Sequence, residues 1–327
     1  MEHLHLLIPE LFLPADIAPA QQPGLRVLET MLARARPLPP AATRDETRLC
    51  ELLGSVAVAP LRAAGDGLTP AADYWMCADP VALQRQPARV MLLPGLPCEL
   101  AQAQAFCAAL NEHFAADGIR FHTPHAQRWY LSCADASEVQ MPTLSAVAWQ
   151  DVRMQLPQGR DALRWQALGN EIQMLLHGHP LNQARSAAGL PTIDSLWLWG
   201  GGRAQTLHGR FDAAGGEEAL QVLARGAGLA VPADLSSLLA SGAQRALWSV
   251  DVLHAALARH DLPGWLAGVQ AVQEQVLQPL WQALGEGRLR SLTLESASGP
   301  VVRSFAWQPS DRWRVWRRRQ PLSAYSV

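Results

Sequence analysis

The stretch from Gly169 to Gly202 most narrows what the chain can fold into, because a helix, a helix break and a buried strand follow one another there. Apolar side chains recur at helical spacing between Trp165 and Leu176, at about 100° per residue, and predict one buried helix face. Pro180 ends that helix, and Gly189-Leu-Pro191 ends a short second one. The apolar run Leu196-Trp-Leu-Trp199 then predicts a buried strand that leads into three glycines.

The opposite face of the same helix carries amides and an imidazole where lysine and glutamate are usual. Gln166, Asn170, Gln173 and His177 form a narrow polar stripe at helical spacing. Such a stripe favours contact with something specific, so Asn170, Gln173 and His177 are candidate ligand-binding residues. The alternative is a helix whose amides bond to neighbouring backbone, and the residues alone leave both interpretations open.

Eight motifs carry a resemblance to known proteins. They are Asn170-Glu-Ile-Gln-Met, His179-Pro-Leu-Asn182, Arg185, Gly189-Leu-Pro191, Ser195-Leu-Trp-Leu-Trp-Gly-Gly-Gly202, Trp75-Met-Cys-Ala-Asp-Pro-Val81, Phe114-Ala-Ala-Asp-Gly-Ile-Arg-Phe121 and Arg128-Trp-Tyr-Leu131. Over most of the chain they resemble a bacterial family of RpfE-type regulatory, phosphoglycerate mutase-like proteins. Over about residues 70 to 202 they are similar, more remotely, to the archaeal type of cofactor-independent phosphoglycerate mutase.

This resemblance implies a phosphatase-like core that carries an inserted domain. The predicted order of strand, helices, α/β block, strand, helix, strand, helix and hairpin fits an α/β fold. We therefore expect a mixed-sheet core domain formed by residues 1–65 and 193–327, related to the phosphatase-like mutase core. A smaller α/β domain, residues 66–192, is inserted in it.

Several elements of the core domain are predicted from turn residues and apolar patterns. After a first strand we expect a proline-rich loop from Pro14 to Pro23, and after Gly202 a strand at 204–207. A turn at Gly215-Gly216 follows. One long amphipathic helix is predicted from Pro263 to Leu284, and a hairpin turns at Ser296-Ala-Ser-Gly299.

The catalytic equipment that the mutase resemblance implies is missing near the N-terminus. That family implies two metal ions held by Asp and His, a serine nucleophile and cations on the phosphate. Here the first strand ends in Ile8-Pro-Glu10 rather than in an Asp-Gly pair, and the first serine is Ser55. The chain contains no lysine at all. We therefore expect no catalysis by the family's mechanism, and no cofactor.

Asp251-Val-Leu-His254 and His260-Asp261 partly resemble the metal-binding motif that the mutase family carries late in its sequence. Asp251, His254 and His260 are accordingly weak metal-ligand candidates. On a continuous helix His254 and His260 would lie on nearly opposite sides, and could not hold one ion. The structural alternative, which we expect, is a helix capped by Asp251 beside two partly exposed histidines.

The end of the central helix gathers groups that could act on a small anion. His177 and His179 are candidate general acid/base residues, and Asn182 and Arg185 could hold the anion between them. Arg128 could add a cation, although it could equally form a buried salt bridge with Asp79. The glycines before Arg203 lack the pattern of a phosphate-binding loop.

The C-terminal run Asp311-Arg-Trp-Arg-Val-Trp-Arg-Arg-Arg319 could stack on bases, bind phosphates or contact an acidic partner. A strand edge with Trp313 against the core and the arginines outside explains the alternation as well. The whole chain has 27 basic and 29 acidic residues, a net charge of −2. Nucleic-acid binding is therefore possible but not favoured, and membrane binding is not expected.

Five cysteines form no Cys-x-x-Cys pair, no secretory leader is recognised, and no apolar run reaches about 18 residues. We expect a soluble cytoplasmic protein with reduced thiols. The leading hypothesis is a non-catalytic mutase-like protein that binds a small anionic metabolite or a protein partner in a regulatory role. The alternatives are an active mutase or phosphotransfer enzyme with a rearranged site at His177, His179, Asn182 and Arg185, and an adaptor acting through the Arg/Trp-rich C-terminus.

Overall fold

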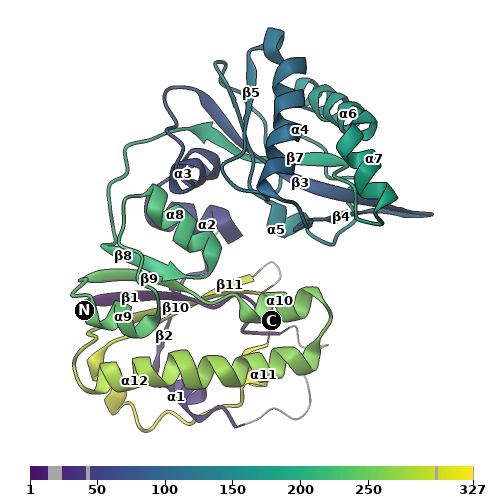
Figure 1. Cartoon of the computed structure of the whole chain (residues 1–327). Helices are drawn as coiled ribbons and strands as arrows, with labels where there is room; N and C mark the ends of the chain where they lie inside the picture. Colours follow the sequence, from purple (N-terminus) through teal and green to yellow (C-terminus); the bar gives the residue numbers. More distant parts are fainter. Residues whose placement is uncertain (14–23, 42–44, 299–300, 327) are drawn as a thin grey trace. The chain divides into compact units, whose positions relative to one another are not determined.

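The computed structural model describes residues 1–13, 24–41, 45–298 and 301–326 (Figure 1). The chain forms two compact units. Unit 1 comprises residues 1–44, 209–224 and 228–327, and unit 2 comprises residues 45–208 and 225–227. The predicted loop from Pro14 to Pro23 and Gly299 of the predicted hairpin turn lie outside the described residues.

Unit 1 is built on a mixed six-stranded sheet in the order β2-β11-β10-β1-β9-β8. The strands are β1 (His3–Leu7), β2 (Arg36–Leu38), β8 (Ala213–Gly216), β9 (Arg245–Ser249), β10 (Leu292–Ser298) and β11 (Val301–Trp307). The central strand β1 runs parallel to β9 and β10, whereas β11 and β2 are antiparallel additions at one edge. The predicted mixed-sheet α/β fold is confirmed.

Helices cover this sheet. They are α1 (Arg26–Arg34), α8 (Glu218–Gly226), α9 (Leu235–Ala240), α10 (Val252–Ala258), α11 (Leu262–Val272), the π-helical η2 (Gln273–Leu277), α12 (Gln278–Gly285) and the short 3₁₀ turns η3 (Pro309–Trp313) and η4 (Leu322–Tyr325). Figure 1 shows α1, α11 and α12 on one face. Alternate residues of β1, Leu4 and Leu6, are buried against apolar side chains of these helices, as the two-residue period of a strand requires.

The helix predicted as one piece from Pro263 to Leu284 is instead α11 and α12 joined through the π-helical turn η2. Pro279 lies at the start of α12 and has no backbone N–H to donate to the preceding turn, so the regular hydrogen-bond ladder is interrupted here. The apolar stripe nevertheless stays in register, because Val269, Val272, Val276 and Leu280 are all buried.

The strand predicted at 204–207 is wrong, and so is the turn predicted at Gly215-Gly216, because those glycines lie inside β8. Their lack of a side chain is a packing requirement. A Cβ atom on Gly215 would lie 2.9 Å from the Trp248 ring, and one on Gly216 would lie 2.0 Å from the Ser249 carbonyl oxygen. Glycine here marks the close approach of neighbouring strands rather than a turn.

Unit 2 is organised around the long strand β3 (Tyr74–Gln86). β7 (Ser195–Arg203) pairs with one side of β3; on the other side are β6 (Tyr130–Cys133), extended by β5 (Ile119–His122), and β4 (Arg89–Leu93). All these pairings are antiparallel. The helices are α2 (Asp45–Leu53), α3 (Val58–Gly65), α4 (Leu100–His113), α5 (Leu144–Val147), α6 (Ala162–Gly178), α7 (Pro180–Ala187) and the 3₁₀ turn η1 (Ala115–Asp117).

The boundaries of the two compact units differ from those of the expected domains. Residues 45–65 and 193–208 were expected in the core domain but lie in unit 2. β7 pairs with β3, and α3 packs against β7, so both segments are held in the unit-2 sheet.

Two of the three glycines of β7, Gly200 and Gly202, allow this packing. A Cβ atom on Gly200 would lie 2.9 Å from the Cβ of Val58, and one on Gly202 would lie 2.4 Å from the Cβ of Ala57. Both contacted residues belong to α3 or its N-terminal flank. Close approach of a helix therefore accounts for these glycines. Among the described residues no helix is long and apolar enough to cross a bilayer, and all five cysteines are free thiols.

Candidate ligand-binding site

α6 positions the candidate site, and its burial follows the sequence pattern. Trp165, Leu168, Ile172 and Leu176 are buried, which confirms the predicted apolar face, and they pack in one cluster with Phe106 of α4. Asp161, the residue at the N-terminal boundary of α6, makes no side-chain cap bond to the helix. The carboxylate of Asp161 instead accepts hydrogen bonds from the Ser137 hydroxyl and the Glu138 backbone N–H.

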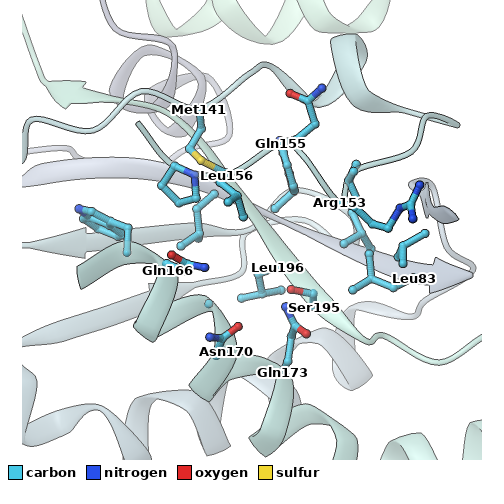
Figure 2. A pocket seen from close by; sticks show the side chains of 18 of the residues that line it. Leu83, Met141, Arg153, Gln155, Leu156, Gln166, Asn170, Gln173, Ser195 and Leu196 are labelled. Carbon is cyan, nitrogen blue, oxygen red and sulfur yellow. The ribbon is translucent and has the colours of Figure 1, made fainter. Parts of the chain in front are cut away.

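A cavity of about 270 Å³ lies in unit 2, bounded by α6, by β3 and β7 and by the loop of residues 152–157 (Figure 2). Its wall is mainly apolar and consists of Met76, Val81, Leu83, Val90, Met141, Val152, Leu156, Pro157, Trp165, Leu196, Trp197 and Leu198. The polar lining groups are Arg153, Gln155, Gln166, Asn170, Gln173 and Ser195. An apolar wall with a few polar groups is the usual composition of a small-molecule site.

Three of the four residues of the predicted polar stripe line this cavity, namely Gln166, Asn170 and Gln173. Figure 2 shows their side chains on α6, near Ser195 and Leu196 of β7. Within the described part of the chain, none of these three amides has a hydrogen-bond partner. The alternative interpretation, in which these amides form hydrogen bonds to neighbouring backbone, is therefore wrong for the described residues.

A wider, more polar hollow of about 1120 Å³ adjoins the cavity. The two share Leu83, Asn170 and Gln173, and the hollow adds Arg85 and His177. Both added side chains are exposed, and no carboxylate among the described residues pairs with Arg85. The hollow therefore offers a cation and an imidazole beyond the amides, together with the carboxylate of Asp194, which accepts hydrogen bonds from the Leu83 N–H and the Thr192 hydroxyl.

Arg153, the one arginine in the cavity wall, is already neutralised. Its guanidinium binds both carboxylate oxygens of Asp151, with the shortest distance 2.7 Å from Nη2 to Oδ2. Hydrogen bonds from the Arg153 side chain and from the Val90 backbone lower the pKa of Asp151. The charge of Arg153 is thus compensated within its own loop.

His179, a catalytic candidate, acts in the structure as the N-cap of α7. Its Nδ1 accepts a hydrogen bond from the Leu181 N–H at 3.2 Å, and its ring centre lies 4.6 Å from that of Phe106. Burial lowers the pKa of His179. Unlike His177, it lines neither the cavity nor the hollow.

Asn182 is buried and joins three segments of backbone. Its Nδ2 donates to the carbonyl oxygens of Leu176 and Ile193, each at 2.8 Å, and its Oδ1 accepts from the Ile193 N–H at 2.9 Å. These bonds tie the end of α6 and helix α7 to the approach of β7. The amide nitrogen and oxygen of Asn182 both bond to protein backbone, although the residue borders the hollow.

Arg185 is 2% exposed and serves as a clamp. Its Nε donates to Pro191, its Nη2 to Pro97 and its Nη1 to the Gln102 side chain, at 2.8 to 3.1 Å. The guanidinium donates to two backbone carbonyl oxygens and one side-chain amide oxygen, so its three nitrogens all have protein partners. It does not present its charge to the cavity.

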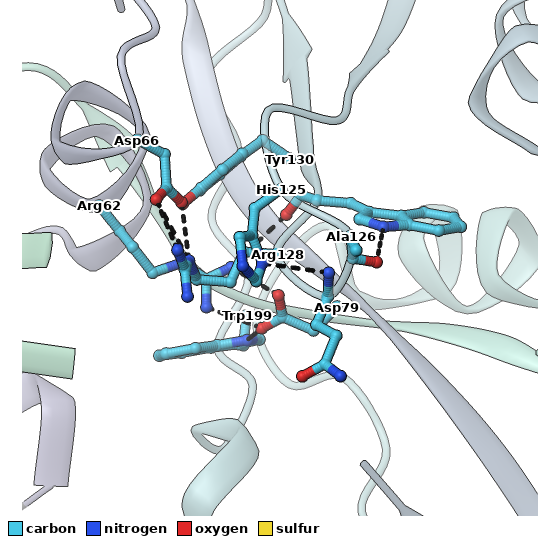
Figure 3. Close-up of polar contacts among 10 residues, drawn as sticks. Arg62, Asp66, Asp79, His125, Ala126, Arg128, Tyr130 and Trp199 are labelled. Carbon is cyan, nitrogen blue, oxygen red and sulfur yellow. Dashed lines mark hydrogen bonds and ion pairs between the residues drawn. The ribbon is translucent and has the colours of Figure 1, made fainter. Parts of the chain in front are cut away.

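Arg128 pairs with Asp66, not with Asp79, so the predicted partner is wrong (Figure 3). Burial alone would raise the pKa of Asp66, but hydrogen bonds from Arg128 and the Tyr130 hydroxyl outweigh it and lower the pKa. The partner of Asp79 is Arg62 of α3, at 2.6 and 2.9 Å, and Trp199 Nε1 also donates to Asp79.

Sequence reasoning missed Arg62, although a signal was present. Arg62 is the one charged residue of Val58-Ala-Pro-Leu-Arg-Ala-Ala-Gly65, and Asp79 likewise stands in an otherwise apolar strand start. Charges in two buried segments predict one another as partners, because an isolated buried charge is very costly.

The weak metal candidates do not come together. α10 ends at Ala258, and His260 follows it with a left-handed backbone, φ 57°. Asp251 makes no side-chain cap bond to α10. Within the described ranges, no three His, Cys, Asp or Glu side chains are grouped so that they could hold a metal ion.

The two sheets with their helices define a mixed α/β protein. Comparison with known proteins shows which of them share its sequence or its fold. No protein-family model matches the chain. Over 92 residues, 27% of the chain, it is 32% identical to a probable 2,3-bisphosphoglycerate-independent phosphoglycerate mutase of Geobacter sulfurreducens. That match spans 23% of the length of the Geobacter protein.

Two solved structures resemble the whole chain. The PH0037 protein of Pyrococcus horikoshii aligns with a TM-score of 0.57 and 11% identity, covering 99% of this chain and 91% of that one. The cofactor-independent phosphoglycerate mutase of Thermoplasma acidophilum aligns with a TM-score of 0.43 and 13% identity, covering 100% and 95%. The Pyrococcus alignment shows a shared fold, and the Geobacter match adds a partial sequence likeness to the mutases.

Proposed function

We propose that the chain is a phosphoglycerate mutase-like protein of the RpfE-type regulatory group that binds a small organic acid instead of catalysing mutase turnover. The observation that carries the proposal is a set of three amides, Gln166, Asn170 and Gln173, which have no partner among the described residues and lie beside a mainly apolar cavity. Amides left without partners beside an apolar wall are suited to orienting a bound molecule.

The lining supports a ligand with an apolar body and an anionic end. The apolar body fits the cavity wall, which has no uncompensated charge because Arg153 is paired with Asp151. Asn170 and Gln173 belong to both spaces and can donate to or accept from the middle of the ligand. Arg85 and His177 in the adjoining hollow complement an anionic end.

A non-catalytic role is supported by what the candidate residues do. Arg185, Asn182 and Arg128 hold the fold together, so the anion cradle of a rearranged phosphotransfer site is already occupied by protein groups. The chain has no lysine, and its first serine is Ser55. We retain the expectation of a cytoplasmic location, in keeping with five free thiols.

The binding proposal is tested by titrating the purified chain with octanoate and with its neutral counterpart octanamide. Trp165 and Trp197 line the cavity, so their fluorescence reports occupancy, and calorimetry gives the affinity. We expect octanoate to bind more tightly than octanamide, and Arg85→Gln to remove most of that difference. If neither compound binds, the cavity is not a site for such acids.

The amides are tested with the double variant Asn170→Leu/Gln173→Leu. Losing about two net hydrogen bonds weakens octanoate binding about tenfold or more. Arg164→Gln is the matched control, because Arg164 is an exposed residue of α6 that lines neither space. Equal loss in both variants would mean that the amides play no specific part.

The non-catalytic part has its own assay. We expect no interconversion of 3-phosphoglycerate and 2-phosphoglycerate by the purified chain with added Mn²⁺. Metal-dependent turnover would contradict the non-catalytic role. It would not affect the binding proposal, which the octanoate titrations test separately.

A further inference from the structure

The proposed function leaves the C-terminal segment 309–319 of unit 1 unexplained. This segment was expected to be a strand edge with Trp313 against the core. The structure contradicts that expectation, because after β11 ends at Trp307 the chain leaves the sheet at Pro309 and turns in η3. The side chains of Trp313, Val315 and Trp316 are 65%, 69% and 72% exposed.

These exposed side chains stand on a segment that is held in place. The buried carboxylate of Asp311 accepts from the Gln308 N–H at 2.9 Å and pairs with Arg314 at 3.1 Å. Arg317 donates to the carbonyl oxygen of Ala35 at 3.1 Å, at the C-terminal end of α1. Arg34 in turn donates to the Arg312 carbonyl at 2.8 Å. The backbone is thus fixed while the indole rings point outward.

The charge around the indoles is positive, and among the described residues most of it has no carboxylate partner. Of the five arginines between Asp311 and Arg319, only Arg314 pairs with a carboxylate among the described residues. Arg318 and Arg319 are exposed, and the Arg312 guanidinium lies 4.8 Å from the centre of the Trp313 ring. We call Arg312, Trp313, Val315, Trp316, Arg318 and Arg319 the Arg/Trp patch.

We infer that the Arg/Trp patch is a binding site for single-stranded nucleic acid. Guanidinium groups neutralise phosphates, and an exposed indole offers a flat face on which an unpaired base stacks. The segment has neither a helix of useful length nor a two-stranded ribbon to enter a duplex groove, so the duplex is disfavoured. Two exposed indole rings, beside guanidinium groups without a carboxylate partner among the described residues, complement bases and phosphates together, whereas an acidic peptide would use only the cations.

The proposal is tested on the full chain by fluorescence anisotropy with labelled oligothymidylate and oligouridylate of about fifteen nucleotides. We expect salt-sensitive binding to both. Trp313→Ala/Trp316→Ala should weaken binding at least about tenfold, and replacing both with phenylalanine should restore part of the loss. Arg318→Ala/Arg319→Ala should lower the slope of log affinity against log salt by about 0.7 per arginine.

Matched controls are Trp149→Ala and Arg259→Ala, which remove an exposed indole and an exposed guanidinium outside the patch. Both should bind as the unmodified chain does. A polyglutamate peptide and vesicles containing phosphatidylserine complete the comparison. Absence of oligonucleotide binding, binding that survives the tryptophan substitutions, or stronger binding to polyglutamate or vesicles would each overturn the assignment.

Discussion

Two sets of polar side chains lie within a few turns of each other in unit 2 and differ in what they contact. Asn182 and Arg185 are buried, and their side-chain groups bond to protein carbonyls, amides and a glutamine side chain. Gln166, Asn170 and Gln173 line a cavity and have no partner within the described residues. The first set therefore belongs to the fold, and the second is available to a ligand.

Residue type alone does not identify a binding group. In a sequence, an arginine and an asparagine near two histidines resemble an anion site. Here Asn182 and Arg185 instead hold α6 and α7 against the segment that leads into β7. The buried Arg62–Asp79 pair extends the first set, because it fixes α3 to β3 in the same unit. Substitutions in the two sets should consequently separate stability from binding.

The largest effect is expected when the buried ion pair is broken. Asp79→Ala leaves Arg62 buried without its carboxylate and also removes the acceptor of Trp199 Nε1, so unfolding free energy should fall by about 3–5 kcal/mol. Urea denaturation measures the loss. The double variant Arg62→Leu/Asp79→Leu is the control, since it removes both charges and should recover much of the stability. A double variant as unstable as the single one would argue against an uncompensated charge.

A smaller loss is expected at Asn182. Replacing it with alanine leaves the Ile193 N–H and the carbonyls of Leu176 and Ile193 without this partner, which costs about 1–3 kcal/mol. Gln183→Ala, at the next, exposed position, should change stability little. Denaturation midpoints that shift equally in both variants would remove Asn182 from the set that holds the fold.

The cavity amides should show the opposite behaviour. Asn170→Leu/Gln173→Leu is expected to change unfolding free energy by no more than about 0.5 kcal/mol, because Asn170 is exposed and neither amide has a partner among the described residues to lose. The same variant should bind octanoate about tenfold or more weakly in calorimetry. Stability loss comparable to that of Asn182→Ala would place these amides with the structural set instead.

Local periodicity predicted the buried face of α6, the helix break before α7 and the strand β7, because each follows from apolar spacing or from proline and glycine chemistry. It also placed Gln166, Asn170 and Gln173 on one face. It could not tell whether that face met solvent, a cavity or backbone, since the cavity wall comes from β3, β7 and residues 152–157, far apart in the chain.

Long-range pairing likewise escaped prediction. Asp66 and Asp79 were both possible partners of Arg128 and Arg62. The pairing depends on the register of β3 with β6 and β7, which places one carboxylate within reach of each arginine. Gly215 and Gly216 look like a turn in sequence, but the neighbouring strand β9 imposes the requirement for glycine. The exposure of Trp313 depends on the chain leaving the sheet after Trp307, which no alternation of residues reveals.

A small, pH-dependent effect is expected from His179, which the sequence grouped with the catalytic candidates and the structure places at a helix start. Burial lowers the pKa of His179 below the ordinary 6.5, so the folded state favours the neutral ring, which accepts from the Leu181 N–H. Its contribution to stability is therefore present above pH 6.5, the unfolded value, and is lost as pH falls through the lowered folded value.

His179→Asn separates the cap from the titration, because asparagine is a good N-cap residue and carries no proton to gain. Denaturation curves from pH 7.5 down to pH 5 should lose stability less steeply in His179→Asn than in the unmodified chain. His179→Ala should be weaker at every pH in that range. If octanoate binding stays unchanged in His179→Asn while the pH slope flattens, the imidazole belongs with Asn182 and Arg185; a parallel slope in both chains would mean that another group causes the pH dependence.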